Sequence, residues 1–203
     1  MRSLSTCTSV RHGNHATFVS KHKKEAHCIC DCKEPLKDDK NLANIAVFLG
    51  GSCNPTTWRH DVAMPMLDAV HVPYYNPQVD EWFEELIEIE TKAKEEAQLV
   101  LFVVDQLTRC LVSINEAVEF ICRGRKVLLV VDNIKNGHDI EGKVLSPTEL
   151  ADFNGARQCL RDLATEKNVG LFPDVESAID ACIAHFAHLN IGKCQSKLPC
   201  RKK

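Results

Sequence analysis

The stretch Leu99-Val100-Leu101-Phe102-Val103-Val104 is the longest apolar run in the chain, and it decides the fold class. It is far shorter than the roughly 20 apolar residues that a membrane-spanning helix needs. A short continuous apolar run is typical of a central strand in a parallel sheet, where helices cover both faces. We therefore expect a buried strand at 99–104.

Shorter apolar runs lie on both sides of this strand, and each is followed by a helical pattern. The predicted strands are centred near residues 47, 74, 102, 129 and 170, and the predicted helices cover 58–70, 80–97, 113–123, 147–166 and 175–189. Repeated alternation of strand and helix implies parallel strands joined by right-handed crossovers. We expect an α/β fold, a flavodoxin-like doubly wound five-stranded parallel sheet of order 2-1-3-4-5.

The two ends of the chain differ in composition from its middle. Residues 1–41 show no hydrophobic periodicity, so we expect a disordered extension, followed by one domain at 42–190 and a basic tail at 191–203. The charges sum to +3 over 1–41, −11 over 42–189 and +5 over 190–203, which gives the net charge of −3. An acidic body argues against nucleic acid as a partner.

The cysteines and the lack of long apolar runs indicate the cellular compartment in which we expect the protein. No stretch suits a membrane helix or a signal peptide, which predicts a cytoplasmic protein without a membrane partner. The 11 cysteines are an odd number, which argues against a disulfide framework. Cys28, Cys30 and Cys32 follow His27 closely, but a closed zinc site usually has a second, separated Cys/His pair, and none lies nearby. We expect a thiol-rich extension and no metal site.

The predicted strand order also indicates where a ligand binds. Ligands of such sheets lie beyond the carboxyl ends of the strands, where the strand order reverses, here between strands one and three. In the loop after strand one, Gly50 and Gly51 allow close approach of a ligand, and Ser52 and Asn54 offer donors to hydroxyl or phosphate groups. The alternative is that the two glycines only form a turn.

Glu116 is the candidate reactive group of the loop after strand three. It lies one turn inside a helix that we expect Ser113 to cap, and a helix N-terminus favours an ionised carboxylate. A carboxylate held ionised in a cleft suits attack on an anomeric carbon. The alternative is that Glu116 only complements the helix dipole.

Several short motifs resemble those of the nucleoside 2-deoxyribosyltransferase family. They cover residues 45–131 in the family's order: Phe48-Leu49-Gly50-Gly51-Ser52 in strand one, Trp58-Arg59 at the first helix, Asn76-Pro77 and then Trp82 after strand two, Ser113-Ile114-Asn115-Glu116-Ala117 after strand three, and Arg123-Gly124-Arg125-Lys126-Val127 before strand four. The resemblance implies cleavage of an N-glycosidic bond, or base exchange, on a deoxynucleoside. It also implies a nucleoside or nucleotide as small-molecule partner, a homo-oligomer, and no cofactor, since the nucleophile belongs to the protein.

The resemblance also implies roles for individual residues. Glu116 falls at the position of the nucleophile, Glu90 falls near an acidic residue that helps to activate the base, and Asp105 is placed to contact the sugar hydroxyls. The substrate-binding positions are expected to be Gly50, Gly51, Ser52, Asn54, Trp58, Asn76, Thr108 and Ser113.

This chain departs from the family at two orienting positions. Phe48 stands where some members carry a Tyr, and Cys110 stands where others carry an Asp six residues before the Glu. The family's Asn from a neighbouring subunit has no clear counterpart, Asn190 being the nearest candidate. These departures resemble a divergent branch, the animal Raw-type developmental proteins. The alternative function is therefore a catalytically inactive nucleotide-binding or scaffolding module. A phosphoribohydrolase is disfavoured because no Gly-Gly-x-Gly-Thr run precedes Glu116.

Overall fold

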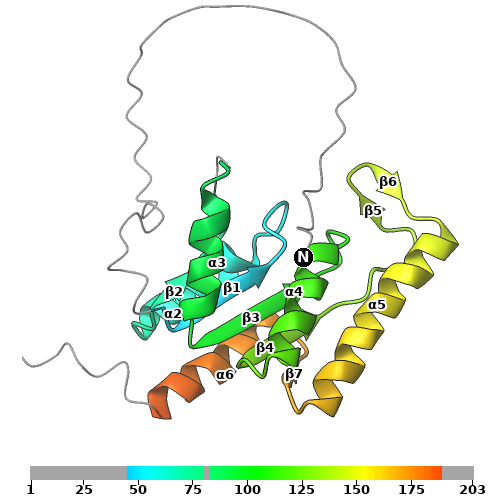
Figure 1. The fold of residues 1–203 in the computed structure, drawn as a ribbon. Helices are drawn as coiled ribbons and strands as arrows, with labels where there is room; N and C mark the ends of the chain where they lie inside the picture. The colour runs from blue at the N-terminus through cyan, green and yellow to red at the C-terminus, as the bar shows by residue number, and fades with distance from the viewer. Residues whose placement is uncertain (1–44, 80–82, 189–203) are drawn as a thin grey trace, which may run out of the picture. The chain divides into compact units, whose positions relative to one another are not determined.

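The computed structural model describes residues 45–79 and 83–188, which form a parallel sheet with helices on both faces (Figure 1). Its strands are β1 (Val47–Gly51), β2 (Tyr74–Tyr75), β3 (Leu99–Val104), β4 (Val127–Val131) and β7 (Gly170–Phe172). They pair in the order β2-β1-β3-β4-β7, and every pairing is parallel. This confirms the flavodoxin-like α/β fold and the five predicted strand positions.

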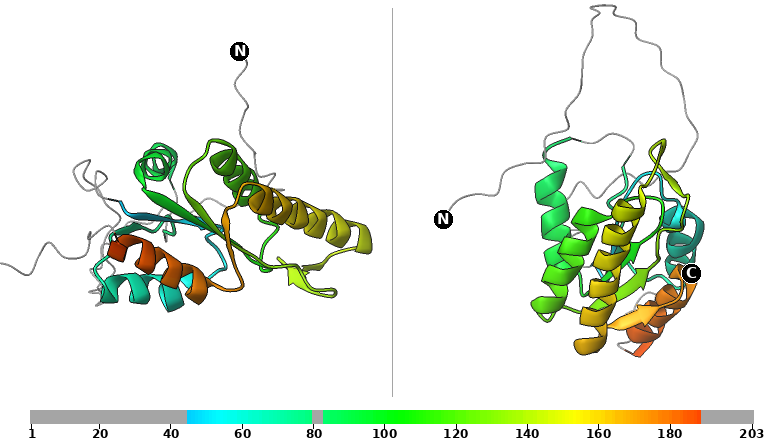
Figure 2. Two further views of the ribbon diagram at one scale, coloured as in Figure 1. Left: turned by 90° about the horizontal axis from the view of Figure 1, so that it is seen from below. Right: turned by 90° about the vertical axis from the view of Figure 1, so that its right-hand side faces the viewer.

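The helices form one layer on each side of the sheet (Figure 2). They are a π-helical turn η1 (Arg59–Ala63) running into α2 (Met64–Ala69), and then α3 (Leu86–Glu96), α4 (Leu111–Cys122), α5 (Pro147–Glu166) and α6 (Val175–His188). Helices α3, α4 and α5 cover one face, while η1, α2 and α6 cover the other. Alternate residues of β3 therefore enter two separate apolar cores, so all of its side chains are buried.

Two helices begin with a capping side chain. Ser146 and Glu149 form a capping box at the start of α5, with Pro147 in its first turn. Asp174 Oδ1 accepts a hydrogen bond from the backbone N–H of Ser177, as expected of the residue that caps α6.

The cap predicted for α4 is wrong. The helix begins at Leu111, and its N-cap residue is Cys110, in the left-handed region at φ 55° without a side-chain cap. Ser113 lies inside the first turn and is buried. The chain enters this helix through a tight left-handed residue, which capping patterns read from sequence do not anticipate.

Two other segments differ from expectation. The predicted helix at 58–70 is interrupted, because Pro65 opens α2 after the wider turn η1. Between β4 and α5, where we expect neither strand nor helix, the chain forms a small antiparallel hairpin, β5 (Asp139–Ile140) and β6 (Lys143–Val144), over a third apolar cluster. Both hairpin strands have only two residues, too short for a periodic signal.

Part of the sequence interpretation lies outside the described residues: the extension at 1–41 with its cysteine cluster, Trp82, Asn190 and the tail at 191–203. Of the described helices, none is long and apolar enough to cross a membrane.

Candidate functional site

A buried arginine fixes the loop that follows β1. The guanidinium of Arg59 donates to the carbonyl groups of Leu49 at 2.9 Å, Gly51 at 2.9 Å and Ser52 at 2.8 Å. Arg59 is fully buried, and burial lowers its pKa to about 10. Its guanidinium also lies over the Trp58 ring, 4.4 Å from the ring centroid. The start of the first helix therefore fixes the loop that precedes it.

A second buried arginine fixes the loop that follows β3. Arg157, on α5, donates to the carbonyl groups of Asp105 at 3.0 Å, Thr108 at 2.9 Å and Asp132 at 3.0 Å. It is also fully buried, and burial lowers its pKa. Because Asp132 follows β4, this one side chain ties the β3 loop to the next strand.

Side-chain contacts join the two loops to each other. The Thr108 hydroxyl donates to the Ser52 hydroxyl at 2.7 Å and lies 2.9 Å from the Cys110 sulfur. The Ser52 hydroxyl donates to the same sulfur at 3.4 Å. Thr108 therefore holds the Ser52 hydroxyl in place from outside the cavity lining.

A third segment, after β2, closes against the β1 loop. The Gln78 side-chain amide donates to the Cys53 carbonyl at 2.6 Å and to the Asn54 side chain at 3.2 Å. Asn76 Oδ1 accepts from the Gln78 backbone N–H at 3.0 Å, which shapes this turn. Asn54 and Asn76 thus hold loops together.

The two glycines of β1 are required by the neighbouring strand. A Cβ on Gly51, whose φ is 118°, would lie 2.4 Å from the Val103 carbonyl oxygen. A Cβ on Gly50 would lie 2.8 Å from the Phe102 ring. Close packing on β3 is therefore sufficient reason for both glycines, in addition to any ligand.

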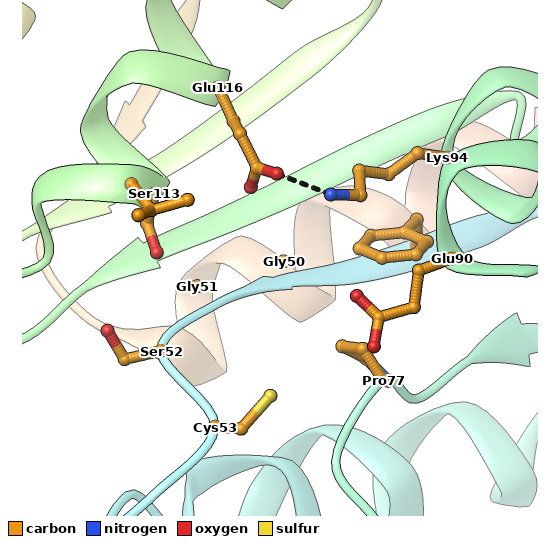
Figure 3. Close-up of a pocket in the computed structure, with 11 residues that line it drawn as sticks. Gly50, Gly51, Ser52, Cys53, Pro77, Glu90, Lys94, Ser113 and Glu116 are labelled. Atoms are coloured by element: carbon orange, nitrogen blue, oxygen red, sulfur yellow. Dashed lines mark hydrogen bonds and ion pairs between the residues drawn. The ribbon is translucent and has the colours of Figure 1, made fainter. Parts of the chain in front are cut away.

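A cavity of about 320 Å³ opens where β1 and β3 end. Its walls come from the β1 loop, the segment after β2, α3 and the start of α4 (Figure 3). The lining residues are Phe48, Gly50, Gly51, Ser52, Cys53, Pro77, Glu90, Lys94, Val112, Ser113 and Glu116. The cavity lies at the topological switch point, as the strand order predicts.

Glu116 reaches from α4 across the cavity to Lys94 on α3 (Figure 3). Lys94 Nζ lies 2.5 Å from Glu116 Oε1, and the two side chains are 13% and 32% exposed. The ammonium group also lies over the Phe48 ring, 5.5 Å from its centroid. Among the described residues, Glu116 Oε2 has no hydrogen-bond partner, and it faces the cavity.

Glu90 lies one helical turn before Lys94 on the same face of α3. Burial raises the pKa of its carboxyl group, Lys94 lowers it, and Glu116 raises it. Its carboxyl group points toward Pro77 and Cys53 (Figure 3). Burial likewise raises the pKa of the Cys53 thiol. The cavity therefore places a carboxyl group with a raised pKa opposite a carboxylate paired with an ammonium group.

The structure brings together about half of the predicted site residues. Gly50, Gly51, Ser52, Glu90, Ser113 and Glu116 line the cavity. The Ser113 hydroxyl points toward Ser52 (Figure 3). These residues come from three separate segments of sequence, so the strand order unites them.

Five predicted site residues lie outside the lining: Asn54, Trp58, Asn76, Asp105 and Thr108. Asp105 is 8% exposed, and its Oδ1 accepts from the Leu107 backbone N–H at 2.9 Å. Burial raises the pKa of this carboxyl group. Trp58 packs against the apolar core on the face of the sheet that η1, α2 and α6 cover. In this geometry these five side chains support the loops.

The sequence interpretation missed Lys94, Cys53 and both buried arginines. The spacing of four between Glu90 and Lys94 was a usable signal, since such residues share one helix face. The sequence gives no comparable signal for Arg59 and Arg157, because charged residues are almost never fully buried and are expected at the surface.

The cavity offers a polar molecule two carboxyl groups and the hydroxyl groups of Ser52 and Ser113. Phe48 and Pro77 add apolar surface to the lining. Over the described residues, no three His, Cys, Asp or Glu side chains are grouped so as to hold a metal ion.

The part of the chain that forms the cavity matches a known family model. Residues 44–134 match the family model described as "Nucleoside 2-deoxyribosyltransferase like". No match to a curated protein accompanies it. The matched range runs from β1 through β4 and contains every residue of the cavity lining. Over this range the chain is therefore similar to the nucleoside 2-deoxyribosyltransferase-like family, as its motifs indicated.

Proposed function

We propose that the protein cleaves the N-glycosidic bond of a deoxynucleoside, or exchanges its base, with Glu116 as the nucleophile. The observation that carries the proposal is the pair of carboxyl groups, Glu116 and Glu90, that line one cavity inside the matched range. Two carboxyl groups in different environments divide the roles of nucleophile and acid. The Glu116 carboxylate is paired with the Lys94 ammonium group, while burial raises the pKa of Glu90.

The reaction proceeds in two steps that conserve atoms and charge. Glu116 Oε2 attacks C1′, forming an ester, as the C1′–N bond breaks and its electron pair moves to the base. Glu90 gives its proton to the departing base. Water or a second base then attacks C1′, the ester C–O electrons return to Glu116, and Glu90 takes the proton of the attacking group. In this scheme the Ser52 and Ser113 hydroxyls bind the sugar.

The test is turnover of deoxynucleosides by the full chain. Each common deoxynucleoside or its 5′-monophosphate is incubated with and without a second free base, and released and exchanged bases are separated by chromatography. Glu116→Gln keeps the size of the side chain but removes the nucleophilic charge, so turnover is lost while the variant remains folded, with a lower unfolding temperature because the ion pair with Lys94 is lost. Equal turnover by Glu116→Gln and the parent would rule out Glu116 as the nucleophile.

A second candidate is a binding module without catalysis. Two observations favour it: Phe48 has no hydroxyl to orient Glu116, and Lys94 already occupies one oxygen of that carboxylate. Such a module would suit a regulatory protein of the Raw-type branch. Calorimetric binding of a nucleoside or nucleotide without release of base supports this candidate over the enzyme.

A further inference from the structure

We propose that Lys94 is a positioning residue, which holds the Glu116 carboxylate by one oxygen and leaves the other directed into the cavity. The proposal rests on the proposed function, since it describes how the same carboxylate is prepared for attack. It is carried by the 2.5 Å ion pair and by the placement of Lys94 between the two carboxyl groups of the cavity.

The burial of Lys94 makes this contact specific. Its side chain is only 13% exposed, whereas most lysines keep their ammonium groups in water. The ammonium lies over the face of Phe48, which stacks on Tyr75 with ring centroids 5.3 Å apart. An ammonium group gains from the electron-rich face of an aromatic ring. Phe48, which has no hydroxyl, thus supports the cation that contacts Glu116.

The position of Lys94 on α3 follows from the helix period. Ala93 belongs to the apolar core on this face of the sheet and Ile89 packs against it, so the helix is held in one rotation. Glu90 and Lys94, four residues apart, then share the face that lines the cavity. The apolar face of α3 therefore sets the position of the polar groups.

Lys94 also acts on the second carboxyl group. Burial raises the pKa of Glu90, and the ammonium of Lys94 is the largest opposing effect. The titratable groups that interact with Glu90 come from every surrounding element: Lys94 on α3, Glu116 on α4, Arg59 on η1, Tyr75 on β2 and Cys53 in the β1 loop. Loss of the ammonium removes the main influence that favours the ionised form, so the pKa of Glu90 rises further.

The first arm of the test needs no substrate. The carboxyl carbon of Glu90 is titrated by NMR in the parent, in Lys94→Met and in Lys92→Met, an exposed lysine of α3 outside the cavity lining. The midpoint for Glu90 moves to higher pH in Lys94→Met and stays in place in Lys92→Met. Thermal unfolding of Lys94→Met, Glu116→Gln and the double variant is non-additive, because the two side chains interact. An unmoved midpoint together with additive unfolding overturns the proposal.

The second arm measures kinetics on the deoxynucleoside that turns over best. Lys94→Met lowers kcat by about 100-fold, as expected for a misplaced reacting group, and leaves KM nearly unchanged. Lys94→Arg keeps the charge and restores most of kcat, which a loss of general packing would not allow. The falling limb of the pH profile, which reports Glu90 as acid, moves to higher pH in Lys94→Met. Unchanged kcat in Lys94→Met overturns the proposal.

The two arms separate this inference from the proposed function. If the parent turns over no nucleoside, the enzyme proposal fails, and the first arm alone decides whether Lys94 holds Glu116. If the parent is active and either arm fails, the enzyme proposal stands and Lys94 has no positioning role. Should Lys94→Met not fold, Lys94→Gln, which lacks the charge but can still donate, replaces it in both arms.

Discussion

Two buried arginines fix the two loops beside the cavity by donating hydrogen bonds to loop carbonyl groups. One arginine is near its loop in the sequence, and the other is far from it. Arg59 lies within ten residues of every carbonyl group that it binds, so its contacts form with the first helix. Arg157 lies far along the chain from the β3 loop, and reaches it only when α5 has packed against α4. The β1 loop is thus a local structure, whereas the β3 loop depends on the assembled sheet.

This difference shows how a charged group can organise a site without touching a ligand. Both guanidinium groups are fully buried without a carboxylate hydrogen-bonded to them among the described residues, and carbonyl oxygens satisfy their donors. Such charge-assisted hydrogen bonds are stronger than neutral ones, and an unsatisfied buried group is costly. The two arginines therefore hold the loops in one conformation from outside the cavity lining, and Ser52 and Ser113 face the cavity.

The largest expected effect comes from removing the long-range arginine. Arg157→Ala removes the side-chain hydrogen bonds to the carbonyl groups of Asp105, Thr108 and Asp132 and opens a cavity, so we expect a loss of about 3 to 5 kcal/mol in the free energy of unfolding. Arg59→Ala should cost less, about 2 to 3 kcal/mol, because its loop can rearrange locally. Urea unfolding of both variants gives the comparison. A larger loss in Arg59→Ala would show that fixing the β1 loop contributes more to the free energy of unfolding than fixing the β3 loop.

The next effect concerns the close approach of β1 to β3. Gly51→Ala places a Cβ 2.4 Å from the Val103 carbonyl oxygen at a φ of 118°, so we expect a loss of about 2 to 4 kcal/mol. The control is Gly124→Ala, also at positive φ, 69°, but with no atom within 4 Å of the new Cβ. We expect about 1 kcal/mol there. Equal losses would mean that strain at φ, and not contact with β3, requires Gly51.

A smaller effect is expected at the start of α5, the helix that carries Arg157. Ser146→Ala removes the side chain that caps the Glu149 backbone N–H, at about 1 kcal/mol. Hydrogen bonds from the Ser146 backbone and then from Lys143 lower the pKa of Glu149 from 4.5 to about 2. Because the folded pKa lies below the unfolded one, the contribution of Glu149 is complete above pH 4.5 and is lost as the pH falls toward 2.

The pH dependence of the capping box is checked by unfolding the parent and Glu149→Gln from pH 7 to pH 2. The difference between their unfolding temperatures should shrink over the acidic part of this range. A constant difference would show that Glu149 acts through packing and not through its charge.

The smallest effect is expected where the hairpin meets the β3 loop. Arg109 Nη1 lies 2.7 Å from Glu141 Oε2, and the Glu141 side chain is 76% exposed. Exposed ion pairs contribute about 0 to 1 kcal/mol. Glu141→Gln should therefore change the free energy of unfolding by less than about 0.5 kcal/mol at moderate salt. If Glu141→Gln lowered the free energy of unfolding as much as Arg59→Ala does, the hairpin would also help to fix the β3 loop.

The sequence predicted the sheet better than the site because the two rest on different signals. Buried strands and amphipathic helices repeat over many residues, so periodicity locates them even when ends are displaced, as at Ser113. A site depends on single side chains and their directions. Asp105 and Asn54 sit in the right loops, but their side chains bind backbone N–H and amide groups of the loops themselves.

By itself, the sequence determined the parallel sheet, its strand order, and the fact that Glu116 and the two glycines lie near the carboxyl ends of neighbouring strands. It did so because apolar periodicity and turn residues are local, and the switch point follows from connectivity alone. Only the tertiary structure decided that Lys94 meets Glu116 and that two arginines are buried behind the loops. The physical reason is that a buried charge is stable only when partners satisfy it. The partners of Lys94 and Arg157 are distant in sequence and meet them only after the sheet has formed, whereas the partners of Arg59 are nearby carbonyl groups, which no sequence pattern marks.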